Sequence, residues 1–255
     1  NGTISGIEGA GVNMSSLGEV FNEGVIEGNW AGVKLDNSAL SNLGTISADL
    51  NNGAAVQLEG NNNFVLNEGN MIASVGLLSL NKGNEVTNTG VITGATNDGV
   101  VLIEGGRVFN SGTIAGGIEP GSNSGADGVT SFSLSPQDNA ELIVENSGTI
   151  TGYRNGISAS AVSSEISNEG VIKGNDGGIF VQRAESENLL TTSITNSGLI
   201  EASGNGPLEQ AGIITPEQSA AITVFGGIDS VVIENSGTIQ GNATGIRSFS
   251  KIELT

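Results

Sequence analysis

Apolar and polar residues alternate over short runs of this chain, and the same alternation returns at a nearly constant interval. An aliphatic residue stands two positions before each complete copy of the sequence Asn-x-Gly-x-Ile, and the isoleucine of that motif, replaced once by Met71, is a second apolar position. A third apolar position follows a further glycine, as in Gly99-Val100 and Gly128-Val129. Apolar residues at every second position are typical of half-buried β-strands. We therefore expect three short strands in each repeat, joined by glycine-containing turns.

The repeated unit is about 22 residues long, and longer intervals consist of this unit plus insertions. The nine complete copies of the motif begin at Asn22, Asn42, Asn67, Asn88, Asn110, Asn146, Asn168, Asn196 and Asn235. A tenth, incomplete copy stands at Gly2-Thr3-Ile4. A fixed period of this length marks a solenoid. Val, Ile and Thr dominate the repeats and fit pleated strands better than helices, and no segment shows a convincing helical period.

The predicted fold is all-β: a right-handed parallel β-helix, or solenoid, of about ten coils. Equivalent residues of successive coils then form columns about 4.8 Å apart, with aliphatic columns inside and an asparagine column at one corner. The handedness follows from the general preference for right-handed crossovers. A solenoid is one continuous core whatever its length, so residues 1–255 are expected to form a single β-helix segment. Because the chain begins inside a repeat, we expect this segment to belong to a longer surface protein.

Composition narrows the possible chemistry. The chain has no Cys and no His, which excludes disulfides and thiolate metal sites and removes the commonest general base. Eight Lys and Arg stand against 27 Asp and Glu, for a net charge of −19. Nucleic acid and anionic membranes are therefore poor partners. No stretch is long and apolar enough to cross a bilayer, so direct membrane insertion of this segment is not expected.

The series Asn-Ser-Gly-Thr-Ile-x-Gly is most regular at residues 110–116, 146–152 and 235–241. This series resembles the passenger domains of bacterial autotransporters and related large secreted adhesins, and the resemblance covers essentially the whole chain. It implies display at the bacterial cell surface or secretion, with attachment to host cells or self-association as the activity. The partners implied are a host surface protein, a host glycan or another copy of the chain. No cofactor is implied.

Four insertions interrupt the repeat. Gly116–Asp127 and Ser203–Ser219 fall at the same turn, three coils apart, whereas Ser135–Asn139 and Ala184–Leu190 fall at another turn. Insertions in solenoids map to loops on one face, which is often the binding face. Neutral drift at tolerant turns is the alternative explanation. The candidate binding residues in the two longer insertions are Glu119, Asp127, Glu209 and Glu217.

Acidic residues also recur before the glycine that opens the third strand. Asp98, Asp127 and Asp176 hold this place in three repeats, and Asn155 holds it in a fourth. Asp98 and Asp127 are expected one rung apart, near the carboxylate separation of a retaining glycosidase. The three acids are also candidates for holding Ca²⁺, which takes several oxygen ligands. Asp-Gly and Asn-Gly are, however, the sequences that tight turns prefer, and we favour that explanation.

Trp30 and Tyr153 are further candidates, because aromatic side chains in exposed turns can stack on sugars. They follow the isoleucine strand of their repeats and stand five coils apart, so they do not form a common platform. Packing over a turn is the simpler role.

Three functions fit the sequence. The first is an adhesin or self-associating passenger that binds through a polar face and projecting loops, where many weak contacts act together. The second is a polysaccharide lyase or hydrolase, which needs clustered acids and a cationic partner. The cations of this chain are scattered and its net charge repels acidic polysaccharide, so an enzyme is not expected. The third is a passive stalk.

Overall fold

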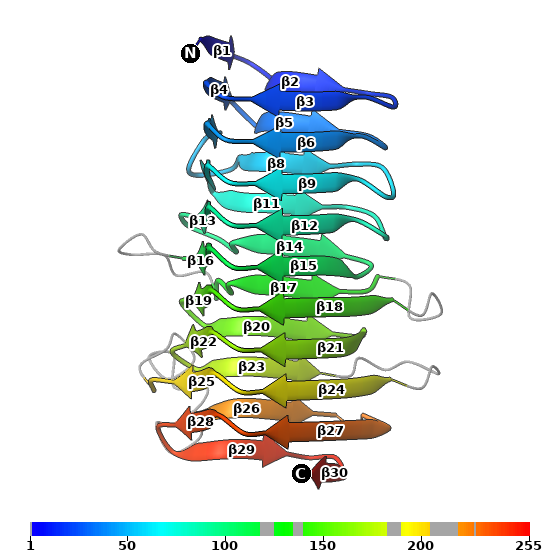
Figure 1. Cartoon of the computed structure of the whole chain (residues 1–255), viewed down its shortest axis with the longest axis vertical. Coiled ribbons are helices and arrows are strands. Elements are labelled where there is room, and N and C mark those ends of the chain that lie inside the picture. Colours follow the sequence, from blue (N-terminus) through cyan, green and yellow to red (C-terminus); the bar gives the residue numbers. More distant parts are fainter. Residues whose placement is uncertain (1, 118–124, 135–139, 183–189, 205–218, 227) are drawn as a thin grey trace.

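The computed structural model describes residues 2–117, 125–134, 140–182, 190–204, 219–226 and 228–255. Within these ranges every regular element is a β-strand, and the strands form three parallel sheets of ten. The strands stack into a column, with the two termini at opposite ends (Figure 1). The chain is therefore a parallel β-helix of ten coils, as the repeat predicts. The candidates Glu119, Glu209 and Glu217 lie outside the described residues.

Each coil supplies one strand to each sheet, in the order A, B, C. Coil 1 holds β1 to β3 and coil 10 holds β28 to β30. The strands of sheet A are β1 Thr3–Gly6, β4 Val25–Gly28, β7 Thr45–Ser47, β10 Asn70–Ala73, β13 Val91–Gly94, β16 Thr113–Gly116, β19 Thr149–Gly152, β22 Val171–Gly174, β25 Leu199–Ala202 and β28 Thr238–Gly241. The strands of sheet B are β2 Ala10–Met14, β5 Ala31–Leu35, β8 Ala54–Leu58, β11 Val75–Ser79, β14 Val100–Ile103, β17 Val129–Phe132, β20 Asn155–Ser160, β23 Gly177–Gln182, β26 Ala220–Phe225 and β29 Thr244–Ser248. The strands of sheet C are β3 Glu19–Asn22, β6 Ala39–Asn42, β9 Phe64–Asn67, β12 Glu85–Asn88, β15 Gly106–Asn110, β18 Glu141–Asn146, β21 Ser163–Asn168, β24 Thr191–Asn196, β27 Ser230–Asn235 and β30 Ile252–Leu254.

The core consists of the three predicted aliphatic columns. Strand pairing places Ile92 beside Ile114 in sheet A, Val100 beside Val129 in sheet B, and Val86 beside Val108 in sheet C. All six side chains are fully buried. Because side chains alternate along a strand, each inward aliphatic residue is flanked by residues that point outward. One side of every sheet therefore faces the interior of the tube and the other faces solvent.

The motif asparagines form a continuous ladder at the corner between sheets C and A. The Nδ2 group of each asparagine donates to the Oδ1 atom of the next, at 2.7 or 2.8 Å, from Asn22 through to Asn235. The same Nδ2 group also faces a backbone carbonyl of its own turn and one of the next coil, such as Gly112 and Thr149 for Asn110. The ladder thus satisfies buried polar groups that would otherwise destabilise a dry corner.

The motif glycines are required by close approach between coils. A Cβ atom on Gly112 would lie closer than 3.0 Å to the carbonyl oxygen of Gly90 in the coil before it, and the same holds for the other eight glycines of this column. Neither the ladder asparagines nor these glycines have a positive φ. The left-handed conformation is used elsewhere, at Asn37 and Asn62 in the turns between sheets B and C. The Asn-x-Gly sequence therefore serves the stacking of coils and not a left-handed turn.

Candidate functional site

The acidic residues before sheet B meet as predicted in coils 5 and 6. Because Val100 pairs with Val129 and Val129 with Ile157, the residues two positions earlier, Asp98, Asp127 and Asn155, occupy one column. The backbone N–H group of Asp127 donates to Oδ1 of Asp98 at 2.6 Å. Asp98 and Asp127 are therefore neighbours in adjacent coils.

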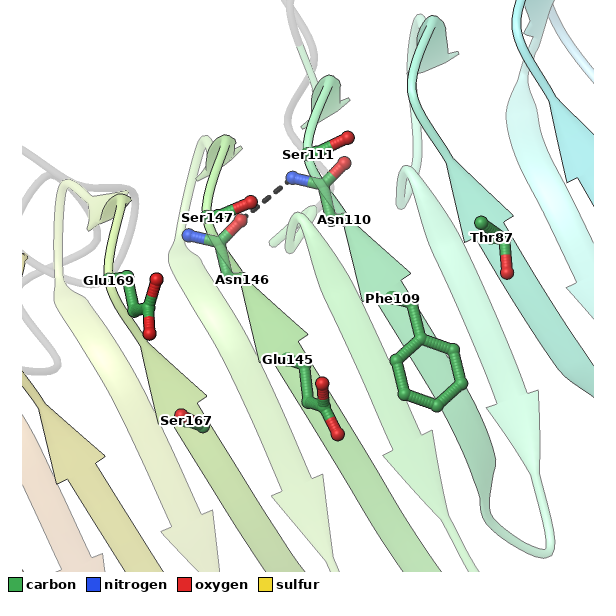
Figure 2. Close-up of a pocket in the computed structure, with 9 residues that line it drawn as sticks. All are labelled: Thr87, Phe109, Asn110, Ser111, Glu145, Asn146, Ser147, Ser167 and Glu169. Atoms are coloured by element: carbon green, nitrogen blue, oxygen red, sulfur yellow. Dashed lines mark hydrogen bonds between the residues drawn. The ribbon is translucent and has the colours of Figure 1, made fainter.

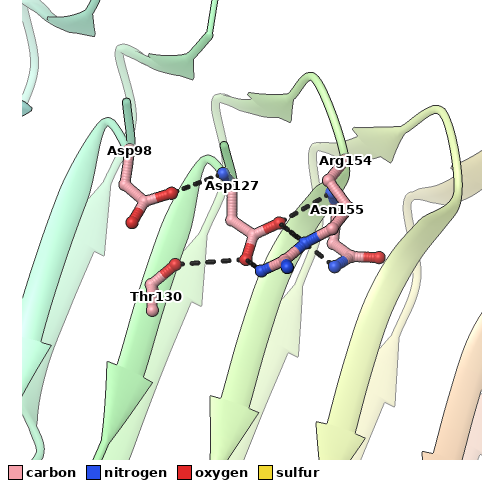
Figure 3. A network of polar contacts seen from close by, with 5 residues as sticks. All are labelled: Asp98, Asp127, Thr130, Arg154 and Asn155. Carbon is pink, nitrogen blue, oxygen red and sulfur yellow. Dashed lines mark hydrogen bonds and ion pairs between the residues drawn. The ribbon is translucent and has the colours of Figure 1, made fainter. Parts of the chain in front are cut away.

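The Asp127 carboxylate is fully buried and is surrounded by donors (Figure 3). Its Oδ1 atom accepts from Nε of Arg154 at 3.0 Å and from the backbone N–H and Nδ2 of Asn155 at 2.9 and 3.1 Å. Its Oδ2 atom accepts from Nη2 of Arg154 at 2.5 Å and from the hydroxyl of Thr130 at 3.2 Å. A bidentate pairing of this kind is a strong, directional contact. Asp127 thus holds two coils together and does not present an exposed carboxylate to a ligand.

The surroundings raise the pKa values of both Asp98 and Arg154, for different reasons. Burial, and then the negative charge of Asp127, raise the pKa of Asp98 to about 6, although the hydrogen bond from Asp127 and the charge of Arg154 act in the opposite direction. Burial disfavours the charged form of Arg154, but the hydrogen bonds and charge of Asp127 outweigh it and raise the pKa of the guanidinium. The Asp98 carboxyl therefore changes charge around pH 6.

Asp176 does not join the column. Strand pairing aligns Asn155 with Gly177, so Asp176 lies one position earlier, opposite Arg154, whose carbonyl accepts its backbone N–H at 2.9 Å. Within the described ranges, no three acidic side chains lie close enough to hold a metal ion. The arrangement supports the turn-forming interpretation of these residues and adds nothing in favour of calcium.

Trp30 and Tyr153 both lie in turns between sheets A and B, in coils 2 and 7. Trp30 is 39% exposed, and the ammonium of Lys34 lies 5.4 Å from the centre of its ring. Tyr153 is half-buried, and its backbone carbonyl accepts a hydrogen bond from Nδ2 of Asn175. The two residues stand five coils apart, too far to contact one ligand face together.

A groove of about 780 Å³ crosses the outer face of sheet B from coil 6 to coil 10. We call it the sheet B groove. Its central lining residues are Thr130, Phe132, Arg154, Ser158, Ser160, Asp176, Phe180, Gln182, Thr223, Phe225, Arg247 and Phe249. Four phenylalanines thus point outward within five successive coils, and two of them, Phe225 and Phe249, lie edge to face with ring centres 5.2 Å apart.

The repeat pattern of the sequence does not predict this groove. The signal was present, because the groove residues are those one and three positions after the inward aliphatic of sheet B, as Thr130 and Phe132 are after Val129. Insertions of unequal length separate these coils, so the alignment of Phe132 with Phe225 and Phe249 is not visible in the repeat spacing. Strand pairing makes it visible.

A second, smaller hollow of about 280 Å³ lies on the outer face of sheet C. Figure 2 shows Phe109 and Glu145 side by side on neighbouring strands there, below the hydrogen bond that joins Asn110 to Asn146. Glu169 lines the same hollow. It is a shallow, acidic surface with one aromatic ring, and it brings no cation near its carboxylates among the residues that line it.

No family model, curated protein or solved structure matches the chain. Among the residues that the structure describes, none belongs to a helix that is long and apolar enough to span a bilayer. What can be inferred about function therefore depends on the two outer faces and on where the insertions join the coils.

Proposed function

We propose that this chain is the rod of a bacterial surface adhesin of the autotransporter-passenger type, and that sheet B carries its binding face. One observation supports this most directly: all four insertions join the column at the edges of sheet B, in coils 6 to 9. Two lie between sheets A and B, after β16 and after β25, and two lie between sheets B and C, after β17 and after β23. The sheet B groove runs between these junctions.

The placement of the insertions argues for selection and against drift. Added residues at a surface turn cost little free energy, so drift alone would spread them over all ten coils. The turn between sheets C and A is closed to them by the asparagine ladder and the glycine column. The turns that flank sheet B vary in length along the column, yet the four insertions gather in coils 6, 8 and 9 around one groove. A binding face explains this concentration.

The proposal is tested by displaying the chain on a non-adherent bacterium and measuring attachment to host cells and clumping. In the test variant, residues 118–124 and 205–218 are each replaced by glycine and serine segments of the same length. The matched control replaces Leu50–Asn52, an exposed turn of coil 3 at the same corner, in the same way. We expect attachment or clumping by the parent and by the control, and its loss in the test variant.

Two results would count against the proposal. A parent chain that is folded and displayed but neither attaches nor clumps is a stalk. Equal attachment by the test variant and the control places the binding face elsewhere. Circular dichroism of the purified chains checks that each variant retains its strands.

A polysaccharide-processing enzyme is the second candidate, because Asp98, whose pKa burial raises to about 6, lies beside Asp127, and the partner of Asp127, Arg154, lines the groove. An acid that titrates near neutrality next to a cation is an arrangement that glycan chemistry uses. The engagement of both Asp127 oxygens with structural donors favours the adhesin. Release of sugars from uronate polymers, abolished by Asp98→Asn or Asp127→Asn, would establish the enzyme instead.

A further inference from the structure

We infer that the sheet B groove is the ligand site of this adhesin and that its ligand is an uncharged oligosaccharide chain. The inference rests on the proposed function, and it names the class of ligand and the residues that contact it. Four features carry it: a notch in coil 7, aromatic rings on both sides of that notch, hydroxyl and amide groups between the rings, and a nearly neutral lining.

The notch arises from strand register. Phe132 of coil 6 pairs with Ser160 of coil 7, and Ser160 pairs with Gln182 of coil 8. In the neighbouring outward row, Ser158 lies between Thr130 and Phe180. The sheet B strand of coil 7 therefore presents two serines, whereas the strands on either side present Phe132 and Phe180. With rungs about 4.8 Å apart, the groove extends about 19 Å from coil 6 to coil 10, enough for several sugar rings in line.

The lining suits the two-sided chemistry of a sugar. A pyranose ring has an apolar C–H face and a rim of hydroxyl groups. Phe132, Phe180 and Phe225 supply flat apolar surfaces for the first, and Ser160 and Gln182 supply donors and acceptors for the second. Ligand sites are commonly lined by apolar and aromatic side chains, with a few polar groups that fix orientation. A purely apolar occupant would leave the hydroxyl and amide groups of this groove without partners.

Charge favours a neutral ligand. The chain carries a net charge of −19, yet the groove is lined by two arginines and one acid, Arg154, Arg247 and Asp176. The guanidinium of Arg154 is neutralised by the Asp127 carboxylate beneath it. A strongly acidic polymer would be repelled by the surrounding surface, and a basic one finds little negative charge within the groove itself.

Two other occupants are disfavoured. An extended peptide binds to a sheet by adding a strand at an open edge, but the strands under this groove, from β17 to β26, are each paired on both sides. Between β17 and β26 the groove therefore offers a peptide no free strand edge for backbone hydrogen bonds. A second copy of the chain also carries a net charge of −19, so the two acidic surfaces would repel one another.

The experiment probes the purified chain on an array of neutral and acidic oligosaccharides, followed by calorimetry with the best soluble hit. Two variants alter the groove: Ser160→Ile fills the notch and Phe180→Ala removes one ring. Matched controls make the same exchanges on the outer face of sheet C, as Ser193→Ile and Phe64→Ala, where both residues are exposed. We expect a neutral glycan to bind, with affinity about tenfold weaker in each groove variant and unchanged in each control.

Other outcomes overturn the inference. If the sheet C controls weaken glycan binding as much as the groove variants do, or if the groove variants do not weaken it, the glycan does not bind in the sheet B groove. Preference for acidic glycans refutes the assignment of a neutral ligand. Displayed cells that attach or clump while the purified chain binds no glycan refute the ligand class and leave the adhesin standing, with a host protein or a second copy as the partner. Cells that show neither behaviour remove the proposed function as well.

Discussion

The asparagine ladder allows a quantitative test of what holds the coils together. In the middle of the ladder, the Nδ2 group of Asn110 donates to Oδ1 of Asn146 at 2.8 Å and faces the carbonyls of Gly112 and Thr149 at 3.3 and 3.2 Å. Its Oδ1 atom accepts from Nδ2 of Asn88 at 2.8 Å. Replacing Asn110 by Asp keeps the shape of the side chain and exchanges its amide donor for a charged acceptor.

The expected cost follows from these contacts. Asn110→Ala removes the two short amide bonds, which takes the donor from the buried Oδ1 of Asn146 and leaves Nδ2 of Asn88 with two longer contacts to backbone carbonyls, at a cost of about 3 kcal/mol. Asn110→Asp additionally turns a carboxylate oxygen toward three acceptors in a buried corner, so we expect a loss of about 5 kcal/mol at neutral pH. Burial raises the pKa of the introduced carboxyl. The loss should therefore shrink as the pH falls through that value, because a protonated carboxyl can donate to one of the acceptors.

Urea denaturation followed by circular dichroism measures the difference in unfolding free energy, and amide hydrogen exchange in coils 5 to 7 reports local opening. A solenoid can unfold in segments, so the local measurement is needed beside the global one. The matched control is Asn235→Asp at the last rung of the ladder, where the asparagine is exposed and its Nδ2 donates to a carbonyl of its own turn. If Asn110→Asp destabilises the chain no more than Asn235→Asp, the buried part of the ladder does not stabilise the stacked coils.

Two further predictions concern the glycine column and the acidic cluster. Gly112→Ala should lower the free energy of unfolding by at least about 3 kcal/mol, because the new Cβ atom would clash with the carbonyl oxygen of Gly90 in the coil before it. In the control, Gly245→Ala, the new Cβ atom would lie 3.5 Å from its nearest neighbour, the carbonyl oxygen of Ile239, so the thermal midpoint should change little. Asp98→Asn should stabilise the chain by about 2 to 3 kcal/mol at pH 7, because a carboxyl whose pKa rises from 3.8 to about 6 on folding binds protons more tightly in the native state. The contribution of Asp98 to the free energy of unfolding falls as the pH rises from about 4 to about 6, so the variant should lose this part of the pH dependence. Curves of unfolding free energy against pH that run parallel for the variant and the parent would contradict this prediction.

Much of the fold could be predicted from the sequence, because one local pattern is repeated ten times. In coils 2 to 9 the aliphatic residue before each asparagine, the apolar residue after each motif glycine and the aliphatic of the third strand are all buried where the period predicts. In the two end coils Ile4 is exposed, and Val12, Ile239 and Ile246 are only partly buried. The preference of a single repeat for strands is weak, but ten repeats with the same preference predict the fold firmly, because each coil must pair its strands with equivalent strands of its neighbours. Of the Asn-x-Gly motif, the sequence predicts the role of the asparagine but not that of the glycine. The amide ladder was expected, but the glycine is needed because carbonyls of the adjacent coil approach it closely, and that contact exists only after stacking.

The candidate site was harder to predict. The pairing of Asp98 with Asp127 followed from their equal distance to the next inward valine, and it is present. The sequence predicts Asp176 in the same column, but in the structure Gly177 occupies that place and Asp176 lies one position earlier. The sequence is ambiguous there because Gly177 and Gly178 follow one another and either glycine fits the motif. The burial of Asp127 and its pairing with Arg154 depend on contacts between coils that no spacing reveals. The groove depends on the same kind of contact, because it is formed by side chains that are 119 positions apart at its extremes, Thr130 and Phe249.

The amino-acid sequence alone determined the period, the strands, the inward columns and the corner where asparagine stacks on asparagine. Each of these depends on residues within one repeat, and alternation with a period of two decides which side chains turn inward. The tertiary structure decided which outward residues become neighbours. Insertions of different length shift the repeats along the chain without shifting the coils in space, because backbone hydrogen bonds hold every coil in register with the next. Which outward side chains form a common surface is therefore determined by strand pairing between coils and not by nearness in the sequence.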